Sequence, residues 1–158
     1  MRALYPDIPD SLLELLKIAD GTYHREYAGE KISFYFLGSD VEAYPYYLLS
    51  AEQMRKAKAD LDWLTDFINR KFDGIEIDDK IIDHAEKMCW LHFSDCMNNG
   101  GSSQLFIDFS PSPNGVKGQI VRYLNDPDQI MVIADSFDEY LRMLMNDGYD
   151  FITQSYDE

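Results

Sequence analysis

The histidines and cysteines come first, because imidazole and thiol groups serve as nucleophiles, bases and metal ligands. None of the three histidines (His24, His84 and His92) stands at the spacing of a zinc-binding helix motif from another. His92 and Cys96 are four residues apart in a predicted strand, so their side chains start roughly 13 Å apart. Cys89 and Cys96 would lie roughly 20 Å apart, too far for a disulfide. The sequence therefore predicts free thiols, with neither a Cys–His nucleophile nor a metal site.

Amide and acidic side chains around the predicted turns offer two further candidates. Residues 98–103 read NNGGSS, which superficially resembles a phosphate-binding loop. This segment joins two predicted strands and has no P-loop lysine, so a hairpin turn is the better interpretation. Asp95 and Asp108 could form a carboxylate pair for acid–base work. Asp108 is better explained as a cap on the turn at Ser110 and Pro111, and we expect the protein not to be an enzyme.

The segment 73–86 carries six carboxylates and a single lysine. Carboxylates at this density can bind a divalent cation or present an anionic face to a partner. Residues 73–78 lack the ligand spacing and turn glycine of a calcium loop. The segment is therefore interpreted as a solvated acidic face, and we expect no metal and no cofactor.

Length and composition indicate one well-filled domain. The chain has 158 residues, of which 46% are hydrophobic and 14% aromatic. A chain of this length can bury roughly 68–70% of its unfolded surface, so we expect residues 1–158 to form a single domain. The apolar runs are too short to span a bilayer, and the start lacks an apolar signal segment. We therefore expect a cytoplasmic protein without a membrane association.

The charge is strongly negative, with 29 acidic against 14 basic residues and a net charge of −15. Such a surface repels nucleic acid and anionic membranes, because both bind through clustered lysine and arginine. It attracts a basic partner and speeds association with one. Solubility alone also explains an acidic composition. The charge thus argues against nucleic acid as a partner and leaves partner recognition and simple solubility both open.

Strands are predicted where aromatic and β-branched residues recur between turn residues. Four such runs lie in the second half of the chain, at 89–93, 104–109, 118–124 and 129–133. Glycine, asparagine and proline separate them, and strands joined by short turns pair antiparallel. Two further runs, at 32–37 and 43–49, are also predicted strands. The second contains Pro45, which places it at a sheet edge or makes it start late.

Helices are predicted at 9–21, 50–71 and 136–148, each with apolar residues at helical spacing. Asp10 or Ser11 is the expected N-cap of the first helix. Ser50 with Gln53, and Ser136 with Glu139, form capping boxes that open the other two, and glycines end the first and last helices. A short helix at 81–88 is expected to lead into the four-strand meander.

Motifs in the second half resemble a known family. WLHF at 90–93, a glycine at 101, IDFSP at 107–111, GVKGQI at 115–120 and ADSFDEYL at 134–141 occur in this order. Together they look like the SUKH superfamily, which includes the Smi/Knr-type cell-wall regulators of fungi and many bacterial immunity proteins. The resemblance extends over roughly 9–144. It implies an α+β fold: a mostly antiparallel sheet of about five to six strands with helices packed on it, without catalysis or cofactor.

For bacterial members, the resemblance implies an immunity protein that neutralises a toxin, often a nuclease, of a polymorphic or contact-dependent system. The negative charge agrees, because an acidic protein can occupy a basic phosphate-binding surface. We place the partner contact on an acidic face near the turns and on exposed sheet surface. The candidate contact residues are Asp78, Asp79, Asp83, Asp95, Asn98, Asn99 and Asp108.

Two alternatives stay open. One is a regulatory scaffold of the Smi/Knr type that binds cellular proteins without a toxin. The other is an enzyme or small-ligand binder with a pocket lined by Tyr44, Tyr46, Tyr47 and Trp90, although packing of the tyrosines on the next helix is the commoner outcome. The sequence does not decide between a monomer and a homodimer.

Overall fold

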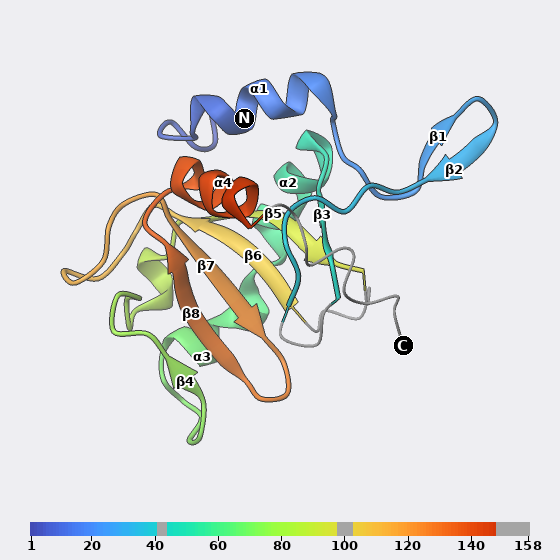
Figure 1. The fold of residues 1–158 in the computed structure, drawn as a ribbon. Helices are drawn as coiled ribbons and strands as arrows, with labels where there is room; N and C mark the ends of the chain where they lie inside the picture. Colours follow the sequence, from blue (N-terminus) through green and yellow to red (C-terminus); the bar gives the residue numbers. More distant parts are fainter. Residues whose placement is uncertain (41–43, 98–102, 148–158) are drawn as a thin grey trace.

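A computed structural model describes residues 1–40, 44–97 and 103–147 of the chain. Its centre is a six-stranded sheet in the order β3-β5-β6-β7-β8-β4, and a separate β1–β2 hairpin projects from the body (Figure 1). Neighbouring strands of the sheet pair antiparallel except β4 and β8, which are parallel. The α+β fold with a mostly antiparallel sheet is therefore confirmed.

The four predicted strands of the second half form the middle of this sheet. They are β5 (Trp90–Cys96), β6 (Ser103–Asp108), β7 (Gln119–Leu124) and β8 (Gln129–Ala134). Each pairs antiparallel with the next, so the meander is confirmed. Neither Cys89 nor Cys96 is in a disulfide, as predicted.

Two short strands form the edges of the sheet. At one edge, β3 (Tyr46–Leu48) begins directly after Pro45, as a proline at this place requires. At the other edge, β4 (Glu76–Ile77) pairs with β8. The predicted strand at 32–37 is wrong. Only Ile32 lies in a strand, and residues 33–37 have no strand pairing, although Leu37 is buried in the core while Phe34 is 60% exposed.

The first hairpin was not predicted. Strands β1 (Arg25–Tyr27) and β2 (Glu30–Ile32) pair antiparallel around a turn at Ala28 and Gly29. Both turn residues have positive φ, 52° and 84°, which suits the twist of a tight hairpin. The strands are short and exposed, so they lack the hydrophobic alternation that identifies a strand from sequence.

The predicted N-terminal caps of the first two helices have different outcomes. Helix α1 (Asp10–Ile18) begins after Pro9 without a side-chain cap, so the predicted cap by Asp10 or Ser11 is wrong. Helix α2 (Ala51–Ala57) has the predicted capping box between Ser50 and Gln53.

Helix α4 (Phe137–Asn146) has half of its predicted capping box. Ser136 Oγ accepts from the Glu139 N–H at 3.1 Å. The Glu139 carboxylate accepts from the N–H of Asp135, one residue before the cap, at 2.8 Å. The predicted stop at Gly148 lies outside the described residues.

The predicted long helix at 50–71 is wrong, because the chain breaks it into four pieces. After α2 come two 3-10 turns, η1 (Lys58–Asp60) and η2 (Asp62–Leu64), and then α3 (Thr65–Ile68). Met54 belongs to the core on one face of the sheet, whereas Leu64 and Ile68 belong to the core on the other. A straight helix cannot reach both faces, so the segment turns at the sheet edge.

The expected helix at 81–88 is likewise only one 3-10 turn, η3 (Ala85–Lys87). Ile81 is nevertheless buried in the core on the same face as Leu64. Hydrophobic residues in this segment therefore record burial against the sheet and not a helical face.

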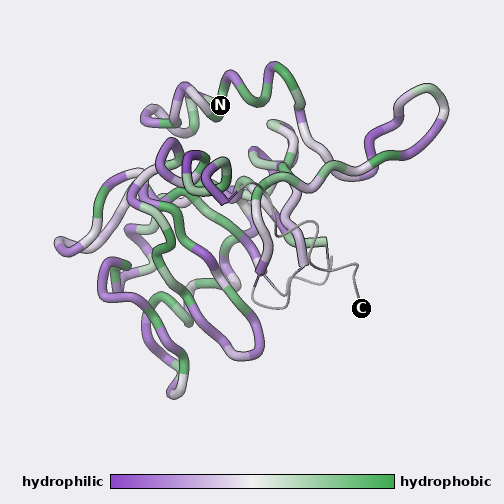
Figure 2. Tube along the Cα trace, viewed as in Figure 1, coloured by the Kyte–Doolittle hydropathy of each residue, from purple (hydrophilic) through white to green (hydrophobic). Residues whose placement is uncertain are grey.

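Two cores cover the two faces of the sheet. Helices α1, α2 and α4 bury residues in the first core, and η2 and α3 in the second, where α3 lies behind the sheet (Figure 1). Alternate strand residues enter opposite cores, as Ile107 and Phe106 do on β6. Hydrophobic residues accordingly follow the strands and hydrophilic residues the turns (Figure 2). The residues of β5, β6 and β7 are mostly buried, and partner contact on exposed sheet surface stays a prediction.

Candidate partner-binding surface

Among the candidate contact residues that the structure describes, Asp108 is the one that is fully buried. Its side chain is fully buried and accepts from Ser110 N at 2.7 Å, Ser110 Oγ at 3.1 Å and Gln119 Nε2 at 2.9 Å. Burial raises the pKa of Asp108, against the opposing effect of these hydrogen bonds. The predicted turn cap is confirmed, and a contact between Asp108 and a partner is ruled out because no surface is left for it.

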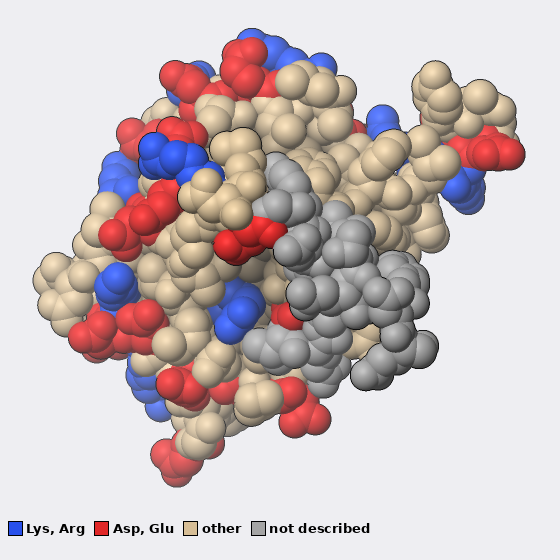
Figure 3. All heavy atoms as spheres, in the orientation of Figure 1, with Lys and Arg blue, Asp and Glu red and all other residues tan. Residues whose placement is uncertain are grey.

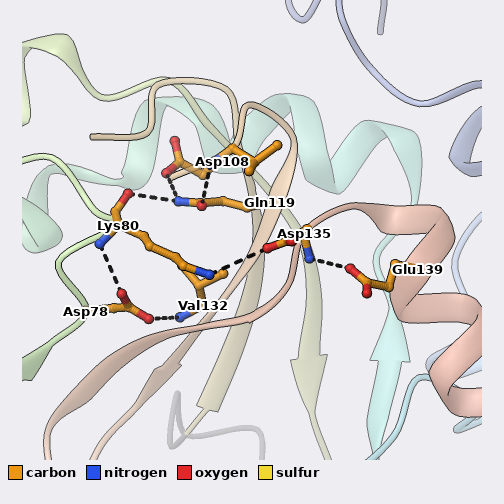
Figure 4. Close-up of polar contacts among 8 residues, drawn as sticks. Asp78, Lys80, Asp108, Gln119, Val132, Asp135 and Glu139 are labelled. Carbon is orange, nitrogen blue, oxygen red and sulfur yellow. Dashed lines mark hydrogen bonds and ion pairs between the residues drawn. The ribbon is translucent and has the colours of Figure 1, made fainter. Parts of the chain in front are cut away.

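Asp78 also has a positioning role. Its carboxylate accepts from Lys80 N at 3.0 Å and from Val132 N at 3.2 Å, which attaches the segment after β4 to β8. Gln119 continues the connection, since its Nε2 donates both to Lys80 O at 3.1 Å and to Asp108 (Figure 4). This network fixes the acidic segment against the ends of β6 and β7.

Asp79 and Asp83 are exposed at the rim of a surface cleft of about 510 Å³. Asn114 Nδ2 donates to Asp79 Oδ2 at 3.1 Å, and His84 lies 3.5 Å from Asp83. Aliphatic side chains, Ile77 and Ile82 among them, line the interior. The cleft thus combines an apolar floor with two carboxylates at the surface.

Arg70 is the basic residue of this cleft, and its guanidinium is already engaged. Nη1 donates to Ile68 O at 2.9 Å and Nη2 to Ile81 O at 3.2 Å. Burial lowers the pKa of Arg70, while the nearby charge of Asp83 opposes the change. Two carboxylates against one guanidinium leave the cleft with an excess of negative charge.

Asp95 lies apart from these residues. It stands on β5, whose place in the sheet is separated from β4 by β6, β7 and β8. Its carboxylate is 3.0 Å from His92 Nε2. Asn98 and Asn99 lie outside the described residues. The structure therefore brings Asp78, Asp79 and Asp83 together and leaves Asp95 at a different place.

The tyrosines of the alternative pocket do not meet Trp90. Tyr46 and Tyr47 are buried in the first core, whereas Trp90 belongs to the second. The Tyr46 hydroxyl hydrogen-bonds Ser103 Oγ, and the Tyr47 ring stacks on Tyr23 with centroids 4.3 Å apart. Burial raises the pKa of both buried phenols. Packing is therefore the correct interpretation of these two tyrosines.

Sequence reasoning missed an aromatic cluster on the α3 side. The side chains of Trp63 and Phe72 are 40% and 51% exposed. Both rings contact the ring of Phe67, which also contacts Tyr123. The signal that could have found it is that Trp63 and Phe67 widen the apolar stripe of the predicted helix beyond what one buried face needs.

On the face in Figure 3, acidic side chains are scattered among basic ones and do not gather in one patch. Among the described residues, no group of three or more His, Cys, Asp or Glu side chains is arranged to hold a metal ion. A helix long and apolar enough to cross a membrane is likewise not found in this part of the chain.

The fold and its surface define an α+β protein with a helix-covered, mostly antiparallel sheet and exposed carboxylate and aromatic groups. The family model of the SMI1 / KNR4 family (SUKH-1) matches residues 4–143, and the chain belongs to this family. The resemblance inferred from the motifs is thereby confirmed. A search of curated proteins finds no significant match.

Proposed function

We propose that this protein is a non-enzymatic, cytoplasmic binding protein of the immunity type, which neutralises a basic toxin such as a nuclease. The observation that carries the proposal is a SUKH-family domain with a net charge of −15. Its exposed Asp79 and Asp83 flank a cleft whose arginine is already engaged. Such a surface fits cationic side chains that would otherwise hold phosphate groups.

The test is capture of partners from the native cell by the tagged protein at low and moderate salt. We expect a basic toxin whose capture weakens as salt rises, because exposed charge pairs are screened. The variant Asp79→Asn/Asp83→Asn should lower affinity by roughly fivefold or more at low salt. The matched control Glu26→Gln/Glu30→Gln changes charge equally on the exposed β1–β2 hairpin and should leave capture intact.

Two results would count against this proposal. Equal losses in both double variants would mean that net charge acts without a specific contact surface. Capture of non-toxin cellular proteins alone would favour the second candidate, a regulatory scaffold of the Smi/Knr type, which the family's description supports.

A further inference from the structure

The rings of the aromatic cluster contact one another in a continuous series, and we call this surface the ledge. It consists of Trp63, Phe67, Phe72 and Tyr123. The Trp63 ring meets Tyr123 edge-on with centroids 4.8 Å apart, and Phe67 at 6.2 Å. Phe67 in turn lies 5.3 Å from Phe72. Tyr123 is buried, whereas Trp63 and Phe72 are 40% and 51% exposed. Large exposed aromatics over a buried anchor are typical of binding surfaces.

A cavity of about 300 Å³ opens beside this ledge, lined by Phe67, Phe72, Asp73, Ile75 and Asp128. It lies where the chain between α3 and β4 meets the turn joining β7 and β8, and Glu76 N donates to Asp128 O there at 3.3 Å (Figure 1). Segments far apart in sequence thus form its two walls.

Asp128 and Asp73 are the charged residues that line this cavity. The Oδ1 atom of Asp128 is buried and has no hydrogen-bond partner. Burial raises the pKa of the Tyr123 phenol, and both the negative charge of Asp128 and a hydrogen bond with its side chain add to the rise. Within the described residues, Asp73 and Asp128 form no ion pair with a lysine, arginine or histidine. Two carboxylates without a basic partner leave the cavity with uncompensated negative charge, which attracts a cation from outside the chain.

We propose that this cavity binds a lysine or arginine side chain of the partner protein, with its cationic head on Asp128 and Asp73 and its stem on Phe67 and Phe72. Aromatic faces attract such cations, and the aliphatic stem fits the apolar walls. A metal ion is a poor fit because it requires several oxygen ligands, which aromatic walls do not supply. The inference rests on the proposed function in that it names how a basic partner is held.

The direct test uses a minimal probe. The tryptophan indole N–H signals are followed by NMR while Nα-acetyl-lysine methylamide is added, then the arginine analogue, then the uncharged norleucine analogue. The chain has two tryptophans, so buried Trp90 serves as an internal reference for Trp63. We expect saturable shifts at Trp63 with the two cationic probes only. An equal response to norleucine, or no response at Trp63, would overturn the inference.

Variants connect the response to the cavity. Asp128→Asn should weaken probe binding roughly tenfold, because it removes the charged acceptor. Phe72→Ala should weaken it roughly two- to fivefold by removing one exposed ring. Glu26→Gln on the distant hairpin removes the same charge and should bind like the wild type. Equal binding by Asp128→Asn and the wild type, with thermal unfolding showing both folded, would refute the assignment.

Partner capture separates this inference from the proposed function. If Asp128→Asn captures a basic toxin as well as the wild type does, the cavity is not the contact and the proposed function stands. If lysine shifts Trp63 but no basic partner is captured, the cavity binds cations and the proposed function fails.

Discussion

Replacing Gln119 with leucine should destabilise the protein strongly, because this buried side chain joins three segments. Its Nε2 donates to Lys80 O at 3.1 Å and to Asp108 Oδ2 at 2.9 Å, and its Oε1 accepts from Val116 N at 3.0 Å. Leucine removes all three bonds while keeping a similar volume. The fully buried carboxylate of Asp108 would then lose the donor to its Oδ2, whereas the Lys80 carbonyl keeps a second donor, the Ser112 N–H at 3.0 Å.

The magnitude follows mainly from the Asp108 carboxylate. A buried acceptor left without its partner costs about 1–3 kcal/mol, and a charged one lies toward the upper end of that range. Val116 is exposed, so water can satisfy its N–H. The Gln119→Leu variant should therefore lose about 2–3 kcal/mol of unfolding free energy. For a chain of this size that corresponds to a fall of about 4–12 °C in Tm.

The assay is urea unfolding followed by tryptophan fluorescence, with Gln104→Leu as the matched control. Gln104 lies on β6 in the same sheet, and its Oε1 is buried without a hydrogen-bond partner. The same substitution there removes an unsatisfied polar atom, so stability should change by less than about 1 kcal/mol. Equal losses at Gln104 and Gln119 would refute the reasoning that the network holds the acidic segment in place.

Three other perturbations probe the same region. Burial raises the pKa of Asp108 in the folded state, so folding takes up a proton at pH values between the unfolded and folded pKa. The stability that protonation of Asp108 contributes is therefore present at low pH and is lost as pH rises through the folded pKa. The stability advantage of the wild type over Asp108→Asn should therefore grow as pH falls from 7 toward 4 in urea titrations, and a constant difference would contradict the shift. Arg70 has a positive φ of 57°, so Arg70→Ala should be less stable than Arg70→Gly by about 1 kcal/mol, with equal stabilities as the opposing result. Gly115→Ala would place Cβ 2.5 Å from Lys80 O, so its Tm should fall further than that of Gly118→Ala, whose Cβ meets nothing within 4 Å but whose φ is 92°.

The sequence by itself determined the elements whose signals are local. Alternation of apolar residues between turn residues predicted the meander from β5 to β8, because strand period and turn chemistry act over a few residues. The capping box at Ser50 was predicted for the same reason. Ordered motifs across the second half identified the family before any geometry was known. The turn cap by Asp108 was also predictable, but its complete burial was not.

Tertiary structure decided what depends on distant segments. The apolar stripe at 50–71 looks like one helix, yet its residues divide between two cores, and only the position of the sheet edge shows where the chain must bend. The acidic segment appeared to be a uniform solvated face, whereas Asp78 binds β8 while Asp79 and Asp83 stay at the surface. The cavity at Asp128 arises because parallel pairing of β4 with β8 brings together residues distant in sequence. Such juxtapositions follow from strand order, which no local pattern encodes.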